Sequence, residues 1–183
     1  CNYWDSMGLP PFRVCFNISP LQFNQRDLPR SIGEFLRESG MQASRLELEL
    51  TESAIMTDAQ TNIEKLQQLK ALGLELAVDD FGTGYSSLSY LKRFPIDTLK
   101  IDQSFVADLG TTDGAAIVDA IIALSKTLNL RVIAEGIEEK EQLDYLVARG
   151  ADLLQGYFFA RPIYPEDVPD MLRQNFSEAL QQS

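Results

Sequence analysis

Short apolar segments alternate with helical patterns along the whole chain, and this alternation limits the possible folds more than any other feature of the sequence. Strands are predicted over residues 13–19, 46–50, 74–78, 99–101, 131–134 and 153–158. Helices are predicted over 27–39, 87–93, 114–128 and 139–149, with another capped by Thr57 and Gln60 and a terminal one opening at Pro165. Because no hairpin turns join the strands, the pattern predicts a parallel sheet.

Charged residues inside the predicted strands bear on whether this sheet is open or closed. Glu47, Glu49, Glu75 and Lys100 all interrupt otherwise apolar segments. A doubly wound open sheet and a closed barrel are both compatible with the alternation. Inward charges on successive strands suit a barrel whose mouth is a reaction site, so we favour a single α/β domain of the barrel type.

The chain contains no histidine, and this absence narrows the available chemistry. It excludes Ser-His-Asp and Cys-His mechanisms and every metal site built from histidine. Carboxylates, amides, lysine and oxygen-preferring cations such as Mg²⁺ or Mn²⁺ remain. The net charge of −11 repels a nucleic-acid backbone, so no polymeric nucleic acid is expected as a partner.

The sequence predicts a cytoplasmic location. The most apolar stretch, residues 115–124, is short and carries Asp119, so no membrane contact by this segment is expected. Cys1 and Cys15 fit neither a disulfide framework nor a zinc knuckle, which favours a reducing compartment. A membrane tether elsewhere in a longer parent protein stays open.

Polar residues follow nearly every predicted strand. They are Asn17, Glu49 with Glu52, Asp79 with Asp80, Lys100 with Asp102, Glu135 with Glu138, and Gln155. In a parallel barrel these strand ends face one rim, so the side chains would form a ring suited to a divalent cation. The competing interpretation is that such a residue only caps the next helix, as Asp102 could before Gln103-Ser104.

A glycine-bearing loop follows the two aspartates and is predicted to be a mobile lid over the site. Its residues are Phe81, Gly82, Thr83, Gly84, Tyr85, Ser86 and Ser87. Asp80-Phe81-Gly82 matches the metal-binding tripeptide of kinases, but no kinase catalytic loop accompanies it. The loop also lacks the third glycine of a dinucleotide-binding fingerprint.

Several motifs, taken in order, resemble the EAL domain family. They are Phe16-Asn17-Ile18-Ser19, Glu49-Leu50-Thr51-Glu52-Ser53, Asp79-Asp80-Phe81-Gly82-Thr83-Gly84-Tyr85-Ser86-Ser87-Leu88, Leu99-Lys100-Ile101-Asp102, Ala134-Glu135-Gly136-Ile137-Glu138, Gln155-Gly156-Tyr157 and Ala160-Arg161-Pro162. The resemblance covers residues 14–162. It implies a modified TIM (β/α)8 barrel that hydrolyses cyclic di-GMP to the linear dinucleotide pGpG with two Mg²⁺ or Mn²⁺ ions per site.

The resemblance also implies residue roles. Asn17, Glu49, Asp79 and Asp80 would be metal ligands, and Asp79 would bridge the two ions. Lys100 would orient the water and stabilise developing negative charge, Glu135 would be a further metal-side or base glutamate, and Glu52 would brace the lid. Asp102, Gln155, Arg161 and Pro162 would contact the substrate.

The chain departs from the family pattern at its N-terminus. The glutamate of the naming motif would lie before residue 1, so residues 1–183 would hold about six of eight strands and lack one metal ligand. We therefore expect an inactive part of a longer protein with regulatory or sensory domains. An open sheet edge would also favour a homodimer.

Two alternatives to the phosphodiesterase stay open. One is a module that binds cyclic di-GMP without cleaving it, although degeneration of that kind should erode metal ligands. The other is a different Mg²⁺-dependent barrel enzyme with a lysine base. The two-aspartate lid loop argues against it.

Overall fold

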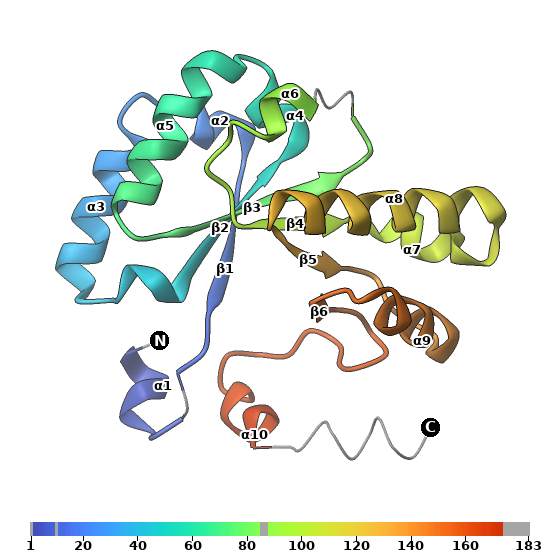
Figure 1. The fold of residues 1–183 in the computed structure, drawn as a ribbon. Helices are drawn as coiled ribbons and strands as arrows, with labels where there is room; N and C mark the ends of the chain where they lie inside the picture. Colours follow the sequence, from blue (N-terminus) through green and yellow to red (C-terminus); the bar gives the residue numbers. More distant parts are fainter. Residues whose placement is uncertain (1, 10, 85–87, 174–183) are drawn as a thin grey trace.

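The structure is a computed structural model that describes residues 2–9, 11–84 and 88–173. Among these residues, six parallel strands pair in chain order (Figure 1). The strands are β1 (Val14–Ile18), β2 (Leu46–Thr51), β3 (Glu75–Phe81), β4 (Thr98–Ile101), β5 (Arg131–Ala134) and β6 (Leu153–Leu154). The sheet curves into a half-barrel whose open edges are β1 and β6. The predicted parallel, barrel-type fold is confirmed.

Helices connect the strands and lie around the outside of the half-barrel (Figure 1). Between β1 and β3 the helices are α2 (Pro20–Phe23), α3 (Leu28–Ser39), η1 (Ala43–Arg45), α4 (Glu52–Met56) and α5 (Ala59–Ala71). Between β3 and β6 they are α6 (Leu88–Leu91), α7 (Gln103–Ala107), η2 (Asp108–Gly110), α8 (Thr112–Leu128) and α9 (Lys140–Arg149). Two short helices, α1 (Asn2–Ser6) and α10 (Val168–Leu172), lie at the two ends.

Strand β2 shows how the alternating pattern positions the site. The hydrophobic core includes three residues of this strand, Leu46, Leu48 and Leu50. Because successive side chains of a strand point to opposite faces, Glu47 and Glu49 point to the concave interior. Both are nevertheless buried, since the curved sheet encloses them.

Several local boundaries differ from the sequence prediction, and β3 runs to Phe81 rather than to Val78. The predicted cap Thr57 is wrong: Asp58 caps α5 by accepting from Thr61 N, and Thr57 ends α4. Strand β6 stops at Leu154, because the backbone of Gly156 packs directly against the backbone of Ile137. The last helix begins at Val168, three residues after Pro165.

The two ends of the described chain meet below the open side of the half-barrel. Trp4 Nε1 donates to the carbonyl of Pro165 over 3.2 Å, joining α1 to the segment before α10. Among the described residues, none of the helices has the length and apolar character needed to cross a lipid bilayer.

Candidate metal centre

The ammonium of Lys100 lies at the centre of the site and touches three carboxylates. Lys100 Nζ is 2.7 Å from Glu49 Oε2, 2.9 Å from Asp79 Oδ1 and 2.8 Å from Glu135 Oε1. These residues come from the ends of β4, β2 and β3 and from the position just after β5. We call Lys100, Glu49, Asp79 and Glu135 the rim cluster. Its carboxylates exceed the charge of Lys100 by two, so a further cation would be attracted here.

Burial and pairing shape the protonation of this cluster. Burial alone lowers the pKa of Lys100, but hydrogen bonds to Glu135, Glu49 and Asp79 outweigh it and raise the pKa above its ordinary value. Lys100 therefore stays charged. Burial raises the pKa of Glu135 despite the opposing effect of Lys100, so this carboxyl group holds a proton more readily than a free glutamate does.

Asn17 at the end of β1 completes the cluster on its open side. Its amide is 3.2 Å from Asp79 Oδ2 and 3.3 Å from Glu49 Oε2, and it satisfies both when its nitrogen faces them. With its oxygen facing them instead, three oxygens would converge as ligands of a hard divalent cation. This donor set fits Mg²⁺ or Mn²⁺, which Asn17, Glu49 and Asp79 would hold.

The neighbouring thiol does not fit this donor set. Although Cys15 lies on the open edge strand, burial of its thiol and the charges of Glu49 and Glu47 raise the pKa of Cys15 to about 11. The thiol stays protonated at neutral pH and is a poor ligand in that state.

A break in strand pairing explains how two consecutive aspartates serve one rim. The register of β3 against β4 shifts between Val78 and Phe81, and Asp80 has a φ of 53°. A bulge of this kind re-aims side chains that a regular strand would send to opposite faces. Burial is the largest cause that raises the pKa of Asp80, and the negative charges of Asp79 and Asp102 raise it further. The carboxyl group of Asp80 lies near both of these side chains.

Glu52 contacts the loop that follows β3. Its Oε2 accepts from Gly82 N over 2.8 Å, and its Oε1 is buried without a partner among the described residues. A Cβ at Gly84 would come within 2.6 Å of Oε1, so a side chain there would require Glu52 to shift. Of the predicted lid, Phe81 is buried at the end of β3, Thr83 Oγ1 donates to Asp80 O, and Tyr85, Ser86 and Ser87 lie outside the described residues.

A hollow of about 310 Å³ opens beside Glu135 at the same rim. It is lined by Gln103, Glu135, Gly136, Glu138, Gln155, Gly156, Tyr157 and Pro162. Arg161 stacks its guanidinium over Tyr157 at 4.9 Å and lines an adjoining hollow. Asp102 caps α7 by accepting from Ser104 N, so it takes the structural role that the sequence left open. Sequence reasoning missed Gln103, although it directly follows the Leu99–Asp102 motif.

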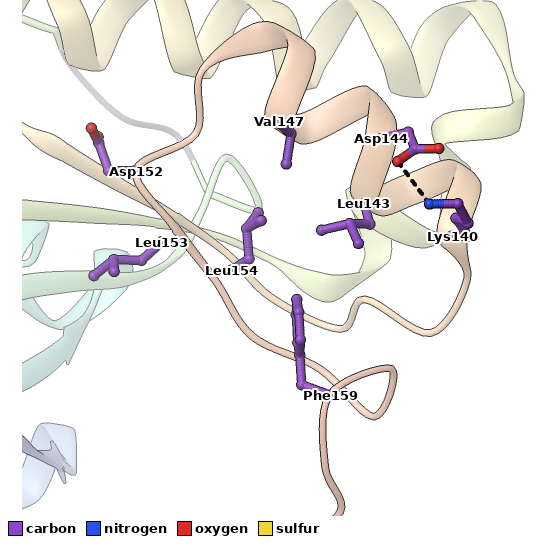
Figure 2. A pocket seen from close by; sticks show the side chains of 8 residues that line it. All are labelled: Lys140, Leu143, Asp144, Val147, Asp152, Leu153, Leu154 and Phe159. Carbon is purple, nitrogen blue, oxygen red and sulfur yellow. Dashed lines mark hydrogen bonds and ion pairs between the residues drawn. The ribbon is translucent and has the colours of Figure 1, made fainter. Parts of the chain in front are cut away.

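A second hollow, of about 380 Å³, lies on the outer side of β6 and is a different kind of surface (Figure 2). Leu143 and Val147 of α9 line it with Leu154 and Phe159. Of the charged residues that line it, Lys140 and Asp144 pair with each other at 3.4 Å, and Asp152 accepts from Val132 N over 2.8 Å. No residue of the rim cluster lines it, so we do not assign the reaction to it.

Comparison with known proteins identifies the family. The model of the EAL domain matches residues 2–162, and the chain belongs to this family. The bifunctional diguanylate cyclase/cyclic di-GMP phosphodiesterase MucR of Pseudomonas aeruginosa is 43% identical over 166 residues, which are 90% of this chain and 24% of MucR. The curated relatives are longer: this chain spans 19% to 25% of the first eight.

Solved structures agree with this assignment. The MucR phosphodiesterase in complex with c-di-GMP superposes with a TM-score of 0.88 at 43% identity, covering 91% of this chain and 68% of that one. A manganese and c-di-GMP complex of BlrP1 from Klebsiella pneumoniae gives a TM-score of 0.77 at 31% identity, covering 86% and 41%. The resemblance predicted from the motifs is confirmed.

Proposed function

We propose that this chain carries the reaction centre of a cyclic di-GMP phosphodiesterase that depends on two Mg²⁺ or Mn²⁺ ions. The observation that carries the proposal is the convergence of three carboxylates on one buried lysine at the rim, with the Asn17 amide against two of these carboxylates. The named activity of MucR and the manganese complex of BlrP1 support it. Cyclic di-GMP is anionic, so it needs cations to approach a chain of net charge −11.

We assign a role to each residue from its position in the site. Asn17 and Glu49 would hold one ion, Asp80 the other, and Asp79 would lie between them. When bound, the ions supply Lewis acidity that activates water and neutralises the attacked phosphate. Lys100, whose three N–H groups already meet Glu49, Asp79 and Glu135, would use its charge to stabilise the negative charge that grows on the phosphate in the transition state. Glu135, whose pKa burial raises, takes up the proton that the attacking water loses.

The reaction balances as a hydrolysis. The water oxygen forms a bond to phosphorus, and the bond from phosphorus to the ribose 3′ oxygen breaks. That oxygen takes a proton, and the product is linear pGpG. The hollow beside Glu135, with Gln155 and Pro162 in its wall and Arg161 in the adjoining one, would receive a guanine and its ribose.

The open edge of the sheet at β1 determines which length of chain should be assayed. Strand β1 pairs on one side only among the described residues, which leaves room for the two further strands that the family resemblance implies. We propose that these strands bring the missing metal-binding glutamate. We use the term complete domain for this chain joined to that upstream segment.

We expect the complete domain to convert cyclic di-GMP to pGpG with Mn²⁺ or Mg²⁺, and the 183-residue chain to be nearly inactive. A ligand site must be held within about 0.5 Å, and an open edge beside Asn17 does not provide that rigidity. Chromatographic detection of pGpG at equal protein concentrations checks both. If the complete domain binds cyclic di-GMP but forms no pGpG, the chain belongs to a binding module instead.

Glu52→Gln tests whether this residue acts on the loop rather than on the metal. The charge-assisted hydrogen bond to Gly82 N would weaken, so we expect a loss on the order of tenfold in kcat. Mn²⁺ affinity should change little, whereas Glu49→Gln should weaken Mn²⁺ binding strongly. Calorimetric titration of both variants in the complete domain separates the roles. Equal losses of Mn²⁺ affinity would assign Glu52 to direct coordination.

A further inference from the structure

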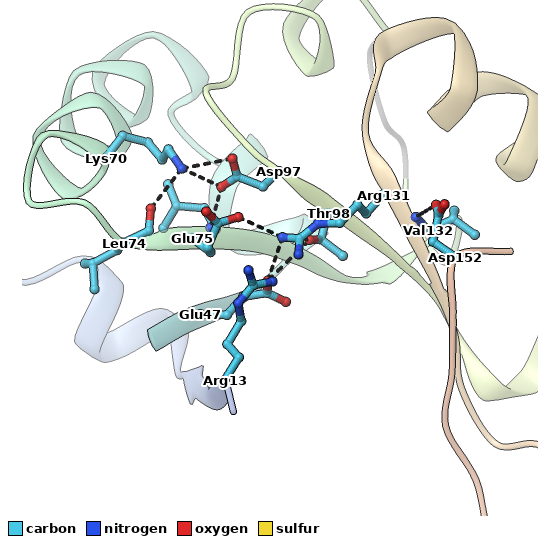
Figure 3. A network of polar contacts seen from close by, with 11 residues as sticks. Arg13, Glu47, Lys70, Leu74, Glu75, Asp97, Thr98, Arg131, Val132 and Asp152 are labelled. Atoms are coloured by element: carbon cyan, nitrogen blue, oxygen red, sulfur yellow. Dashed lines mark hydrogen bonds and ion pairs between the residues drawn. The ribbon is translucent and has the colours of Figure 1, made fainter. Parts of the chain in front are cut away.

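A second group of polar side chains, drawn in Figure 3, precedes the rim cluster along the strands. In this group Glu47 and Thr98 are buried, Glu75 and Arg131 are half-buried, and Arg13 is exposed. Glu47 Oε2 accepts from Arg13 Nη1 and Arg131 Nη2, each over 3.0 Å. Arg131 Nη2 also donates to Glu75 Oε2 over 2.7 Å and to Thr98 Oγ1 over 2.9 Å. We call these five residues the lower polar layer. Its two arginines and two glutamates leave no net charge.

Each member of this layer lies an even number of residues before a member of the site on the same stretch of chain. The pairs are Arg13 with Asn17, Glu47 with Glu49, Glu75 with Asp79, Thr98 with Lys100, and Arg131 with Glu135. An even spacing places both members on one face of a strand. The two layers are close together, since one oxygen of Glu47 and one of Glu49 lie within 4.8 Å of each other.

The contacts of the layer join strands that are not neighbours in the sheet. Glu47 on β2 meets Arg131 on β5, and Glu75 on β3 meets the same arginine. Such contacts require the sheet to curve, because in a flat sheet strands β2 and β5 would be three inter-strand spacings apart, roughly 14 Å. The rim cluster has the same requirement: Lys100 reaches Glu49 on β2 and Glu135 after β5.

We propose that Glu47 and Arg131 are positioning residues for the cation site: their contact across the interior holds β2 and β5 at the separation that Glu49 and Glu135 need. The rim carboxylates carry excess negative charge and repel each other, whereas the lower layer is neutral and fully paired. The ion pairs of the lower polar layer therefore oppose the repulsion among the carboxylates of the rim cluster. The inference rests on the proposed function, because it takes the rim cluster to be a cation site.

Two variants with opposite changes of charge distinguish the positioning role from a purely electrostatic effect on Mn²⁺ binding. Glu47→Gln removes a negative charge near the site, and Arg131→Gln removes a positive one. A field effect alone would weaken Mn²⁺ binding in the first variant and strengthen it in the second. Loss of position weakens binding in both, on the order of tenfold, the lower end of what the loss of a supporting group costs. Thr98→Val, which changes no charge, should cause a smaller loss.

Asp97→Asn is the matched control. Asp97 pairs with Lys70 at 2.7 Å and accepts from Leu76 N (Figure 3). Its backbone carbonyl accepts from Arg131 N over 2.9 Å, but among the described residues its side chain forms no hydrogen bond or ion pair with the lower polar layer, so the substitution leaves that layer's side-chain contacts unchanged. We expect this variant to lose thermal stability while its Mn²⁺ affinity stays unchanged. Arg131→Lys keeps the charge and a donor and should restore part of the affinity.

The experiment is Mn²⁺ titration of the complete domain followed by electron paramagnetic resonance, with thermal unfolding of every variant. Weaker Mn²⁺ binding in both Glu47→Gln and Arg131→Gln, without a change in Asp97→Asn, supports the inference. Tighter or unchanged binding in Arg131→Gln overturns it, and so does equal weakening in Asp97→Asn. A wild-type domain that binds no Mn²⁺ overturns the proposed function itself. Should Arg131→Gln fail to fold, Thr98→Val decides: unchanged affinity there overturns the inference.

Discussion

Asp79→Asn in the complete domain should abolish measurable hydrolysis of cyclic di-GMP while leaving the fold intact. Asp79 contacts Lys100 at 2.9 Å and lies 3.2 Å from the Asn17 amide, so it borders two other groups of the proposed site. Asparagine has the same shape but lacks the charge that would hold two cations together. Removing one electrostatic group from a transition state costs about 10²–10³-fold in kcat, and a shared metal ligand should cost at least that.

The control for this prediction is Asp113→Asn, which makes the same charge change at the exposed first turn of α8. It should hydrolyse at the wild-type rate. Rates of pGpG formation are measured at saturating Mn²⁺, and circular dichroism verifies the fold. Turnover by Asp79→Asn within a few-fold of wild type would contradict the bridging role.

The fold followed from the sequence because it depends on local periodicity. Alternation in β2 separates Leu48 and Leu50 from Glu47 and Glu49, and a parallel sheet then brings the strand ends to one rim. The placement of Glu49, Asp79 and Glu135 along one rim needs only this rule and the rank of each residue in its strand, whereas their shared contact with Lys100 also requires the sheet to curve. The rim was therefore predictable before any tertiary contact was known.

Contacts that depend on curvature were not predictable. Arg131 and Glu47 are 84 residues apart, and nothing local marks them as partners. The same holds for Asp97, which holds Lys70 and Leu76 N together across a loop. The φ of Asp80 is another such feature, because the bulge arises from pairing between β3 and β4 rather than from its own side chain. Charges at even spacing below the rim were the available signal for the lower polar layer.

Lys100→Met should strongly destabilise the metal-free protein. Lys100 is 3% exposed, and its removal leaves Glu49, Asp79 and Glu135 without their shared counter-charge. Breaking a buried ion pair in this way costs about 3–5 kcal/mol of unfolding free energy. Lys70→Met is the control, because Lys70 is 28% exposed and meets one carboxylate, so a loss of about 1 kcal/mol or less is expected.

The pH and cation dependence of Lys100→Met identify the cause of its instability. Without the ammonium, burial and mutual repulsion disfavour the ionised forms of the three carboxyl groups. Because burial already raises the folded pKa of Glu135, its protonation at low pH relieves part of this repulsion, and stability falls as the pH rises through that raised value. Adding Mn²⁺ should restore more unfolding free energy to Lys100→Met than to the wild type, since a bound cation replaces the missing charge. Urea unfolding of the complete domain at several pH values, with chelator or with Mn²⁺, measures both effects. Wild-type stability of Lys100→Met in chelator at neutral pH would mean that the three carboxylates do not depend on Lys100 for their pairing.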